Sequence, residues 1–166
     1  LFSGTVQDNI FFGQSEAVDT DETLQQALQL SQAAEFVDRY PEKAAHPIAQ
    51  LGRNVSGGQK QRLSIARALA RRPEILIFDD SFSALDYKTD ATLREGLAKQ
   101  LPGTTKIIVA QRISTIRHAD QILVLDRGEI AGLGTHDALM ASCPVYREIA
   151  MSQLSEEELK KGGASK

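Results

Sequence analysis

NVSGGQKQRLSIARALARRPEILIFDDSFSALD, residues 54–86, contains in order a glycine turn, an amphipathic helix, an apolar strand and an acidic turn. Apolar residues after the turn recur at helical spacing and are Leu63, Ala66, Leu69 and Ala70. This spacing predicts a helix, and Ser56 at its start is the expected N-cap. The stretch therefore predicts a helix followed by a strand.

The start of this helix suits an anion. The first N–H groups of a helix have no intrahelical acceptor and carry a positive partial charge. Gly57 and Gly58 lack the Cβ atoms that would keep a phosphate away. An ordinary capped helix after a glycine turn is the alternative, and Ser-Gly-Gly alone does not distinguish the two.

The strand after the helix ends in two acids. Residues 75–78, ILIF, are bounded by turn signals, which predicts a strand buried on both faces of a parallel sheet. Asp79 and Asp80 follow it directly. Ligands of α/β proteins bind at the carboxyl ends of such strands, where a hard oxygen ligand suits Mg²⁺ carried by phosphates.

Further elements are expected on both sides of this stretch. Residues 106–110 predict another short buried strand, and residues 121–134 predict two strands joined in a hairpin. The expected helices are residues 21–31, capped by Thr20 or Asp21; residues 33–40; residues 87–101, capped by Asp86; a short helix capped by Thr135; and residues 145–154. Residues 155–166 predict a charged, solvated tail.

Bulk properties restrict the class of protein. A chain of 166 residues with 42% hydrophobic content supports one domain with a core, and a net charge of −3 gives no reason to expect nucleic acid. Cys143 is the only cysteine, which excludes an internal disulfide. The three histidines, His46, His118 and His136, lack the spacing of zinc ligands.

Several ordered motifs resemble those of ATP-binding cassette (ABC) proteins. VSGGQKQRLSIARAL, residues 55–69, resembles their signature motif, ILIFDD resembles the Walker B strand, and SALD, residues 83–86, resembles the D-loop. Residues 107–139 resemble the switch-loop region of ABC exporters. The resemblance covers residues 1–154 and implies an α/β fold, the C-terminal part of a P-loop, RecA-like ABC ATPase domain with a parallel sheet core and a helical subdomain.

The resemblance also indicates what precedes this chain. LFSGTVQDNIFFG, residues 1–13, resembles the segment after the Q-loop glutamine, and no G-x-x-x-x-G-K-[ST] occurs in the sequence. The Walker A motif, the Q-loop glutamine and a fused transmembrane domain are therefore expected upstream, and this piece alone is expected to be inactive. Gln50 stands where exporters often carry an acidic X-loop residue.

Site residues follow from the motif matches. In ABC dimers each ATP lies between the Walker motifs of one domain and the signature of the other. The residues expected to face a partner's nucleotide are Ser56, Gly57, Gly58 and Gln59. The residues expected to form the D-loop at the dimer interface are Ser83, Ala84, Leu85 and Asp86. Asp79 is expected to hold Mg²⁺ through water.

Two positions depart from the family pattern. Asp80 stands where the family usually has a glutamate that polarises the attacking water, and Gln111 stands where it usually has a histidine. With an intact signature, this pattern resembles the degenerate subunit of a heterodimeric bacterial multidrug-type exporter. It implies ATP, Mg²⁺ and a second, non-identical ABC subunit at the cytoplasmic face of the inner membrane. The alternatives are a non-transport ABC ATPase and a homodimer that uses ATP only to hold its subunits together.

Overall fold

The computed structural model describes residues 1–13 and 20–153, so the predicted tail at residues 155–166 lies outside the described residues. Two compact units divide the chain, Leu1–Val109 and Ala110–Lys166, and each is described by itself. The expectation that residues 1–154 form one partial domain stays a prediction. In the part of the chain that the structure describes, no helix has the length and apolar character needed to cross a membrane.

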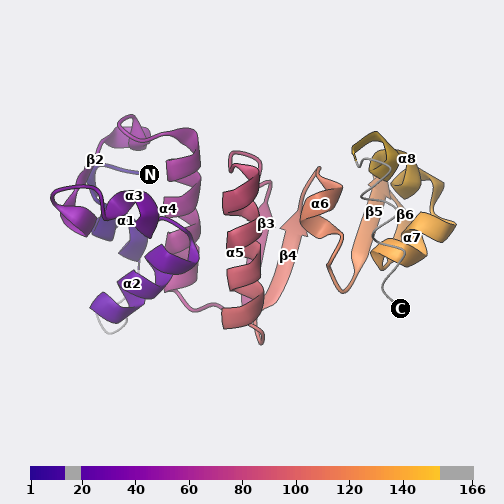
Figure 1. The fold of residues 1–166 in the computed structure, drawn as a ribbon, viewed down its shortest axis with the longest axis horizontal. Coiled ribbons are helices and arrows are strands. Elements are labelled where there is room, and N and C mark those ends of the chain that lie inside the picture. The colour runs from indigo at the N-terminus through magenta and orange to yellow at the C-terminus, as the bar shows by residue number, and fades with distance from the viewer. Residues whose placement is uncertain (14–19, 154–166) are drawn as a thin grey trace. The chain divides into compact units, whose positions relative to one another are not determined.

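The first unit contains helices, two 3₁₀ turns and two strand pairs (Figure 1). Its helices are α1 (Val6–Phe11), α2 (Asp21–Leu30), α3 (Ala34–Val37), α4 (Gly57–Ala70) and α5 (Tyr87–Gln100), and its 3₁₀ turns are η2 (Lys43–Ala45) and η3 (Gln50–Gly52). Its strands are β1 (Gly4–Thr5), β2 (Pro47–Ile48), β3 (Ile75–Asp79) and β4 (Thr105–Val109). Strands β1 and β2 pair antiparallel, and β3 and β4 pair parallel.

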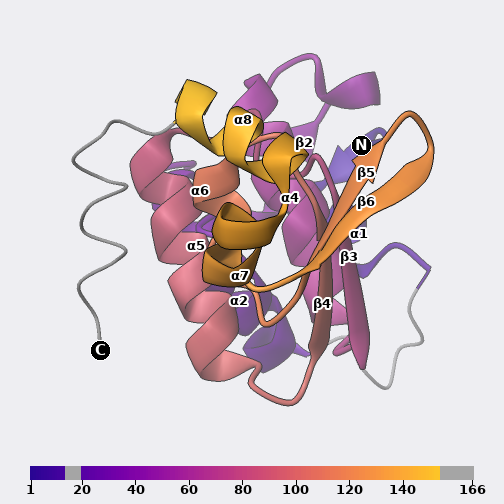
Figure 2. The ribbon, with the colours of Figure 1, turned by 90° about the vertical axis from the view of Figure 1, so that its right-hand side faces the viewer.

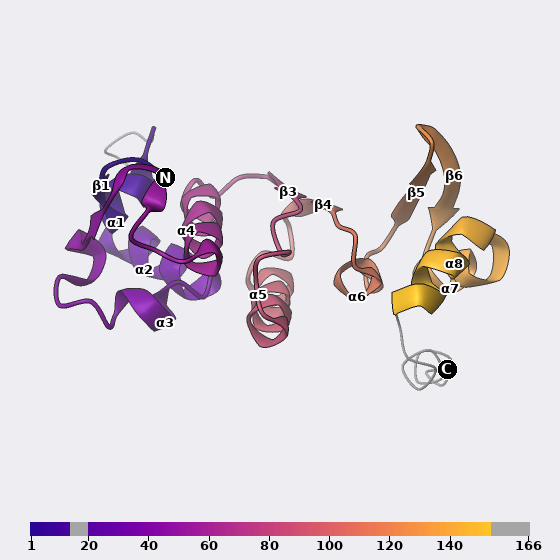
Figure 3. The ribbon, with the colours of Figure 1, turned by 90° about the horizontal axis from the view of Figure 1, so that it is seen from above.

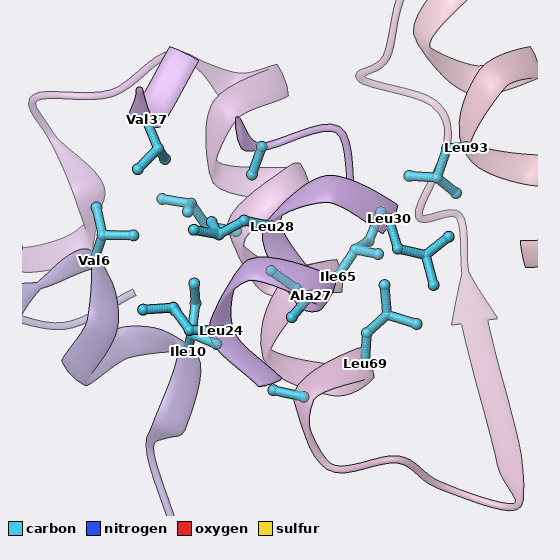
Figure 4. Close-up of a cluster of buried hydrophobic side chains, with 14 of the residues drawn as sticks. Val6, Ile10, Leu24, Ala27, Leu28, Leu30, Val37, Ile65, Leu69 and Leu93 are labelled. Atoms are coloured by element: carbon cyan, nitrogen blue, oxygen red, sulfur yellow. The ribbon is translucent and has the colours of Figure 1, made fainter. Parts of the chain in front are cut away.

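The core of the first unit lies where α1, α2 and α4 meet (Figure 4). The apolar residues of α2 are buried, namely Leu24, Ala27, Leu28 and Leu30. The N-cap of α2 is Thr20, one of the two predicted caps, and its hydroxyl accepts from the N–H of Thr23. The predicted helix at residues 33–40 is shorter, because only residues 34–37 are α-helical. After Val37 the backbone tightens to i→i+3 hydrogen bonds, from Arg39 N to Phe36 O and from Tyr40 N to Val37 O.

The β3 and β4 pair corrects one prediction about burial. Leu76 and Phe78 lie on one face and are buried in the same core cluster as Leu93 of α5. Helix α5 runs alongside this strand pair (Figure 2). On the other face Ile75, Ile77, Ile107 and Val109 are 49% to 68% exposed. The expectation that residues 75–78 are buried on both faces was therefore wrong, as was the burial expected for residues 106–110. Parallel pairing was predicted correctly, since Ile77 pairs with Ile107 and Asp79 with Val109.

The second unit is a hairpin packed with helices (Figure 3). Its elements are α6 (Ile113–Ile116), β5 (Ile122–Asp126), β6 (Glu129–Gly134), α7 (His136–Ser142) and α8 (Pro144–Gln153). The predicted hairpin is confirmed: β5 and β6 pair antiparallel, and Arg127 and Gly128 both have positive φ, at 48° and 83°. Two consecutive residues with positive φ are typical of two-residue hairpin turns, whose backbone twist matches that of the flanking strands. Thr135 caps α7, as expected.

Candidate functional site

The start of α4 is held by a reciprocal pair of hydrogen bonds. The Oγ of Ser56 accepts from the N–H of Gln59 at 3.3 Å, and the N–H of Ser56 donates to Oε1 of Gln59 at 2.8 Å. The N-cap prediction for Ser56 is confirmed, and Gln59 closes a capping box that the Ser-x-x-Gln spacing could have shown. The N–H groups of Gly57 and Gly58 have no intrahelical acceptor, and the Ser56 hydroxyl can still donate its proton.

The two glycines at this helix start face different surroundings. In the part of the chain that the structure describes, a Cβ built on Gly57 meets nothing within 4 Å, so this position faces open space. A Cβ built on Gly58 lies 3.2 Å from the carbonyl oxygen of Ala84. The open side therefore belongs to Gly57, and Gly58 lies against the chain's own residues 83–86.

Asp79 is the last residue of β3 and Asp80 follows it directly, and both side chains are exposed. Asp80 has a left-handed backbone, with φ of 47°, and its N–H donates to the carbonyl of Val109 at 3.0 Å. Its carbonyl accepts from the N–H of Ser83 at 3.3 Å and from the hydroxyl of Ser83 at 2.9 Å. The turn after the strand is thus fixed by the backbone of Asp80, which leaves the carboxylate exposed.

The carboxylate oxygens at the end of β3 decide whether a cation could bind there. No group of three or more His, Cys, Asp or Glu side chains that could hold a metal occurs within residues 1–13 and 20–153. Two adjacent exposed carboxylates are hard oxygen donors, and Mg²⁺ binds through one or two carboxylates when phosphates and water complete its shell. The residues present therefore fit a Mg²⁺ that arrives with phosphates, with Asp79 as the candidate.

Residues 81–86 form a turn anchored by apolar side chains. Phe82 and Leu85 are buried, while Ser83 and Ala84 are exposed between them. Asp86 caps α5 as predicted, accepting from the N–H of Thr89 at 3.0 Å and from its hydroxyl at 2.6 Å. These hydrogen bonds lower the pKa of Asp86, and the one from the Thr89 side chain has the largest effect. The loop therefore exposes two small residues, Ser83 and Ala84, between two side chains that are held in the core.

Gln111 belongs to the second unit and is described only there. Its side chain is exposed, and its carbonyl accepts from Nε2 of Gln153 on α8 at 2.8 Å. The same Gln153 accepts from the N–H of Ile113 at 2.9 Å through its Oε1. In the first unit, the structure brings the start of α4 together with the carbonyl oxygen of Ala84.

A partly buried clamp, formed by Arg67 of α4 on Asn9, was not predicted from the sequence. The Arg67 Nε donates to the carbonyl of Asn9 at 2.6 Å, and its Nη2 donates to Oδ1 of Asn9 at 3.0 Å. Its guanidinium also lies 5.4 Å from the ring centre of Phe2 and 5.8 Å from that of Phe12. The partners stand 58 positions apart, so no local pattern shows the pair.

Comparisons with known proteins agree with the motifs. The ABC transporter family model matches residues 2–83. An uncharacterized ABC transporter ATP-binding protein of Mycobacterium tuberculosis is 48% identical over 154 residues, which are 92% of this chain and 26% of that protein. The probable multidrug resistance ABC transporter ATP-binding/permease protein YheI of Bacillus subtilis is 45% identical over 148 residues, 89% of this chain and 25% of that protein.

A solved structure of a bacterial Atm1-family ABC exporter with ATP bound shares the fold. Its TM-score is 0.87 at 35% identity, over 94% of this chain and 27% of that chain. The chain thus spans about a quarter of the length of the relatives that it matches.

Proposed function

This chain belongs to the ABC transporter ATP-binding family, and on that premise we propose that it is part of the nucleotide-binding domain of an exporter. ATP binding and hydrolysis by the whole protein drive a substrate across a membrane whose cytoplasmic face carries this domain. A transmembrane domain of the same polypeptide forms the path that the substrate takes across the membrane. Support comes from the name of the Bacillus relative, a multidrug resistance permease protein, and from the fold shared with an exporter.

We propose further that the chain contributes the degenerate site of an asymmetric heterodimer. One observation carries this proposal: Asp80 and Gln111 replace the usual glutamate and histidine, while Ser56, Gly57, Gly58 and Gln59 keep the signature intact. Such a combination suits a chain whose signature completes a competent site on a second, non-identical ABC subunit. Its own site binds ATP far better than it hydrolyses it.

The chemistry of the two departures supports a slow site. Hydrolysis requires a water held in line with the γ-phosphate, and a misplacement of about 1 Å can cost on the order of 100-fold in rate. Asp80 is one methylene shorter than glutamate, which retracts its oxygens from that water. Gln111 can donate a hydrogen bond, but it cannot take up a proton near neutral pH as an imidazole can.

The signature residues act on the nucleotide held by the partner. The Ser56 hydroxyl and the N–H groups of Gly57 and Gly58 lie at the positive end of α4, where a phosphate is favoured. The open space at Gly57 supports this role, because a ligand can approach the backbone there. Asp79 is the residue that would hold Mg²⁺, which supplies charge neutralisation of the phosphates when bound.

The experiment that tests this assignment compares single substitutions in the full-length heterodimer. Ser56→Asp keeps a good N-cap residue but adds a negative charge where the phosphate binds, so most ATP turnover is lost while the unfolding temperature is retained. Asp80→Asn changes turnover comparatively little, because its site contributes little. Ser64→Ala, at an exposed serine of the same helix, is the matched control. Equal losses from Ser56→Asp and Asp80→Asn contradict the proposal.

The identity of the partner is tested by purification of the full-length protein. Co-purification with a second, non-identical ABC subunit supports the heterodimer. Recovery of a self-pair that binds ATP without hydrolysing it supports instead a homodimer held together by nucleotide.

A further inference from the structure

Gly58 and Ala84 bring two backbones of the first unit into close contact. A Cβ on Gly58 would lie 3.2 Å from the Ala84 carbonyl oxygen, which is tighter than nine in ten real Cβ contacts. The atom facing Gly58 is backbone rather than the end of a flexible side chain. A larger residue at position 58 therefore requires the backbone of residues 83–86 to move by a few tenths of an ångström.

The loop that carries Ala84 is fixed on both sides. Before it, the carbonyl of Asp80 holds the N–H and the hydroxyl of Ser83. After it, Leu85 is buried in the core and Asp86 caps α5. The start of α4 is fixed equally by the capping box between Ser56 and Gln59. The contact thus joins two stiff segments, so a displacement of one is passed to the other.

We infer that Gly58 is a positioning residue that seats residues 83–86 against the start of this chain's own signature helix. The two adjacent glycines have different roles. Gly57 leaves space for a ligand, and Gly58 leaves space for the Ala84 carbonyl of the same chain. A phosphate that draws the start of α4 toward itself thereby moves residues 83–86 in the same chain. The functional consequence rests on the proposed function, while the contact itself does not.

A double-mutant cycle in the full-length protein with its partner tests this inference. The variants are Gly58→Ala, Ala84→Gly and the two combined, with Gly57→Ala as the matched control in both backgrounds. Glycine at position 84 frees the backbone to turn its carbonyl away from position 58. The fall in kcat caused by Gly58→Ala is then smaller by about fivefold or more in the Ala84→Gly background, because residues in contact are coupled.

The control shows a different pattern, since a Cβ built on Gly57 meets nothing within 4 Å among the described residues. Gly57→Ala lowers kcat by the same factor in both backgrounds. If Gly58→Ala also lowers kcat by one factor in both backgrounds, the inference is overturned. Should Gly58→Ala prevent folding, recovery of folded protein on adding Ala84→Gly supports the contact, and no recovery contradicts it when Gly57→Ala folds.

Failure of the proposed function is recognised separately. If the unsubstituted protein hydrolyses no ATP, the proposed function fails, and the same cycle is then read from thermal unfolding. The fall in Tm caused by Gly58→Ala is smaller in the Ala84→Gly background if the contact exists. Equal falls in both backgrounds overturn the inference without reference to ATP.

Discussion

Asp80 combines an unusual backbone with an exposed carboxylate. Its φ of 47° lies in the left-handed region, where Asp and Asn are several times more frequent than other residues with a side chain. Its carbonyl and N–H both take part in the turn after β3. The aspartate at this position therefore suits the local backbone, whatever it does to the attacking water.

The account of the slow site predicts a gain of activity from two substitutions together. Asp80→Glu restores the longer carboxylate and Gln111→His restores a group that can exchange protons, so turnover at the slow site rises by on the order of 10- to 100-fold. The measurement is the rate at which retained ATP becomes ADP in the full-length protein with its proposed partner.

A matched control keeps the position polar but removes the base. Asp80→Asn with Gln111→His leaves the retained ATP intact, because asparagine cannot accept a proton from water. An equal rise in both double variants contradicts the assignment of Asp80.

At the scale of elements, α4 depends on the N-terminal segment for its orientation. Arg67 reaches from α4 to Asn9, which is buried and binds the carbonyls of Phe2 and Thr5 through its amide. Arg71, one turn later, donates to the carbonyl of Phe12 at 2.8 Å. Arg67 of α4 and its C-cap residue Arg71 thus hold α1 and the residue that follows it.

This clamp predicts a loss of stability when its centre is removed. Arg67→Ala removes the donor to the carbonyl of Asn9 and one of two donors to its side-chain oxygen, which still accepts from the N–H of Phe2 at 3.1 Å. The substitution destabilises the protein by about 1–3 kcal/mol. Urea unfolding of the full-length protein, followed in the nucleotide-binding domain, measures the loss.

The control for this prediction is an exposed ion pair. Lys99→Ala removes only the exposed partner of Glu95 and changes stability far less than Arg67→Ala does, because solvent screens an exposed pair. Similar losses from Arg67→Ala and Lys99→Ala would show that the clamp contributes little.

The second unit carries a contact that depends on pH. Nδ1 of His136 lies 2.8 Å from the Tyr146 hydroxyl, and burial, followed by the charge of Arg117, lowers the pKa of His136 below 6.5. Asp137 and His118 are the other charged or titratable groups that act on it. Burial also raises the pKa of Tyr146, which stays neutral near pH 7.

The direction of this shift fixes how stability depends on pH. A histidine whose pKa is lower in the folded protein than in the unfolded chain favours folding when the pH is above the unfolded-state pKa. Stability therefore falls as the pH drops below about 6.5. Amides of α7 therefore exchange faster at about pH 5.5 than at about pH 7.5, after correction for intrinsic exchange. His136→Gln keeps a polar side chain and removes this dependence. An unchanged pH dependence in that variant contradicts the role of His136.

At the scale of the whole molecule, the sequence predicted local elements better than their surroundings. Caps at Ser56 and Asp86 were predicted correctly, and Thr20 is one of the two caps predicted for α2, because capping depends on residues only a few positions apart. The hairpin of β5 and β6 was predicted for the same reason. Local order is encoded locally, so a single sequence was enough for these features.

Features that depend on distant partners escaped prediction. The prediction that β3 is buried on both faces was wrong, because an apolar run of four residues does not show which of its faces a neighbouring element covers. The seat of Ala84 on Gly58 and the clamp of Arg67 on Asn9 join residues far apart in the chain. The roles of the candidate site residues stay predictions, because they concern a nucleotide and a partner.

The exposed face of β3 and β4 predicts how the 166-residue chain behaves alone. Ile77 and Ile107 are paired neighbours on a face with further exposed apolar side chains, and such patches promote association. Ile77→Thr with Ile107→Thr reduces the self-association seen by sedimentation velocity. Met151→Thr, at an exposed residue of α8, leaves it unchanged. If both changes have the same effect, this face does not drive association.

Single-turnover ATP hydrolysis by the full heterodimer tests the central claim most directly, with nucleotide counted at both sites after washing. The account predicts that one ATP per dimer stays intact while the other is hydrolysed, because Asp80 and Gln111 make a slow site and the intact signature completes a competent one. Hydrolysis of both ATP molecules at similar rates would contradict it, since these two residues would then support ordinary turnover.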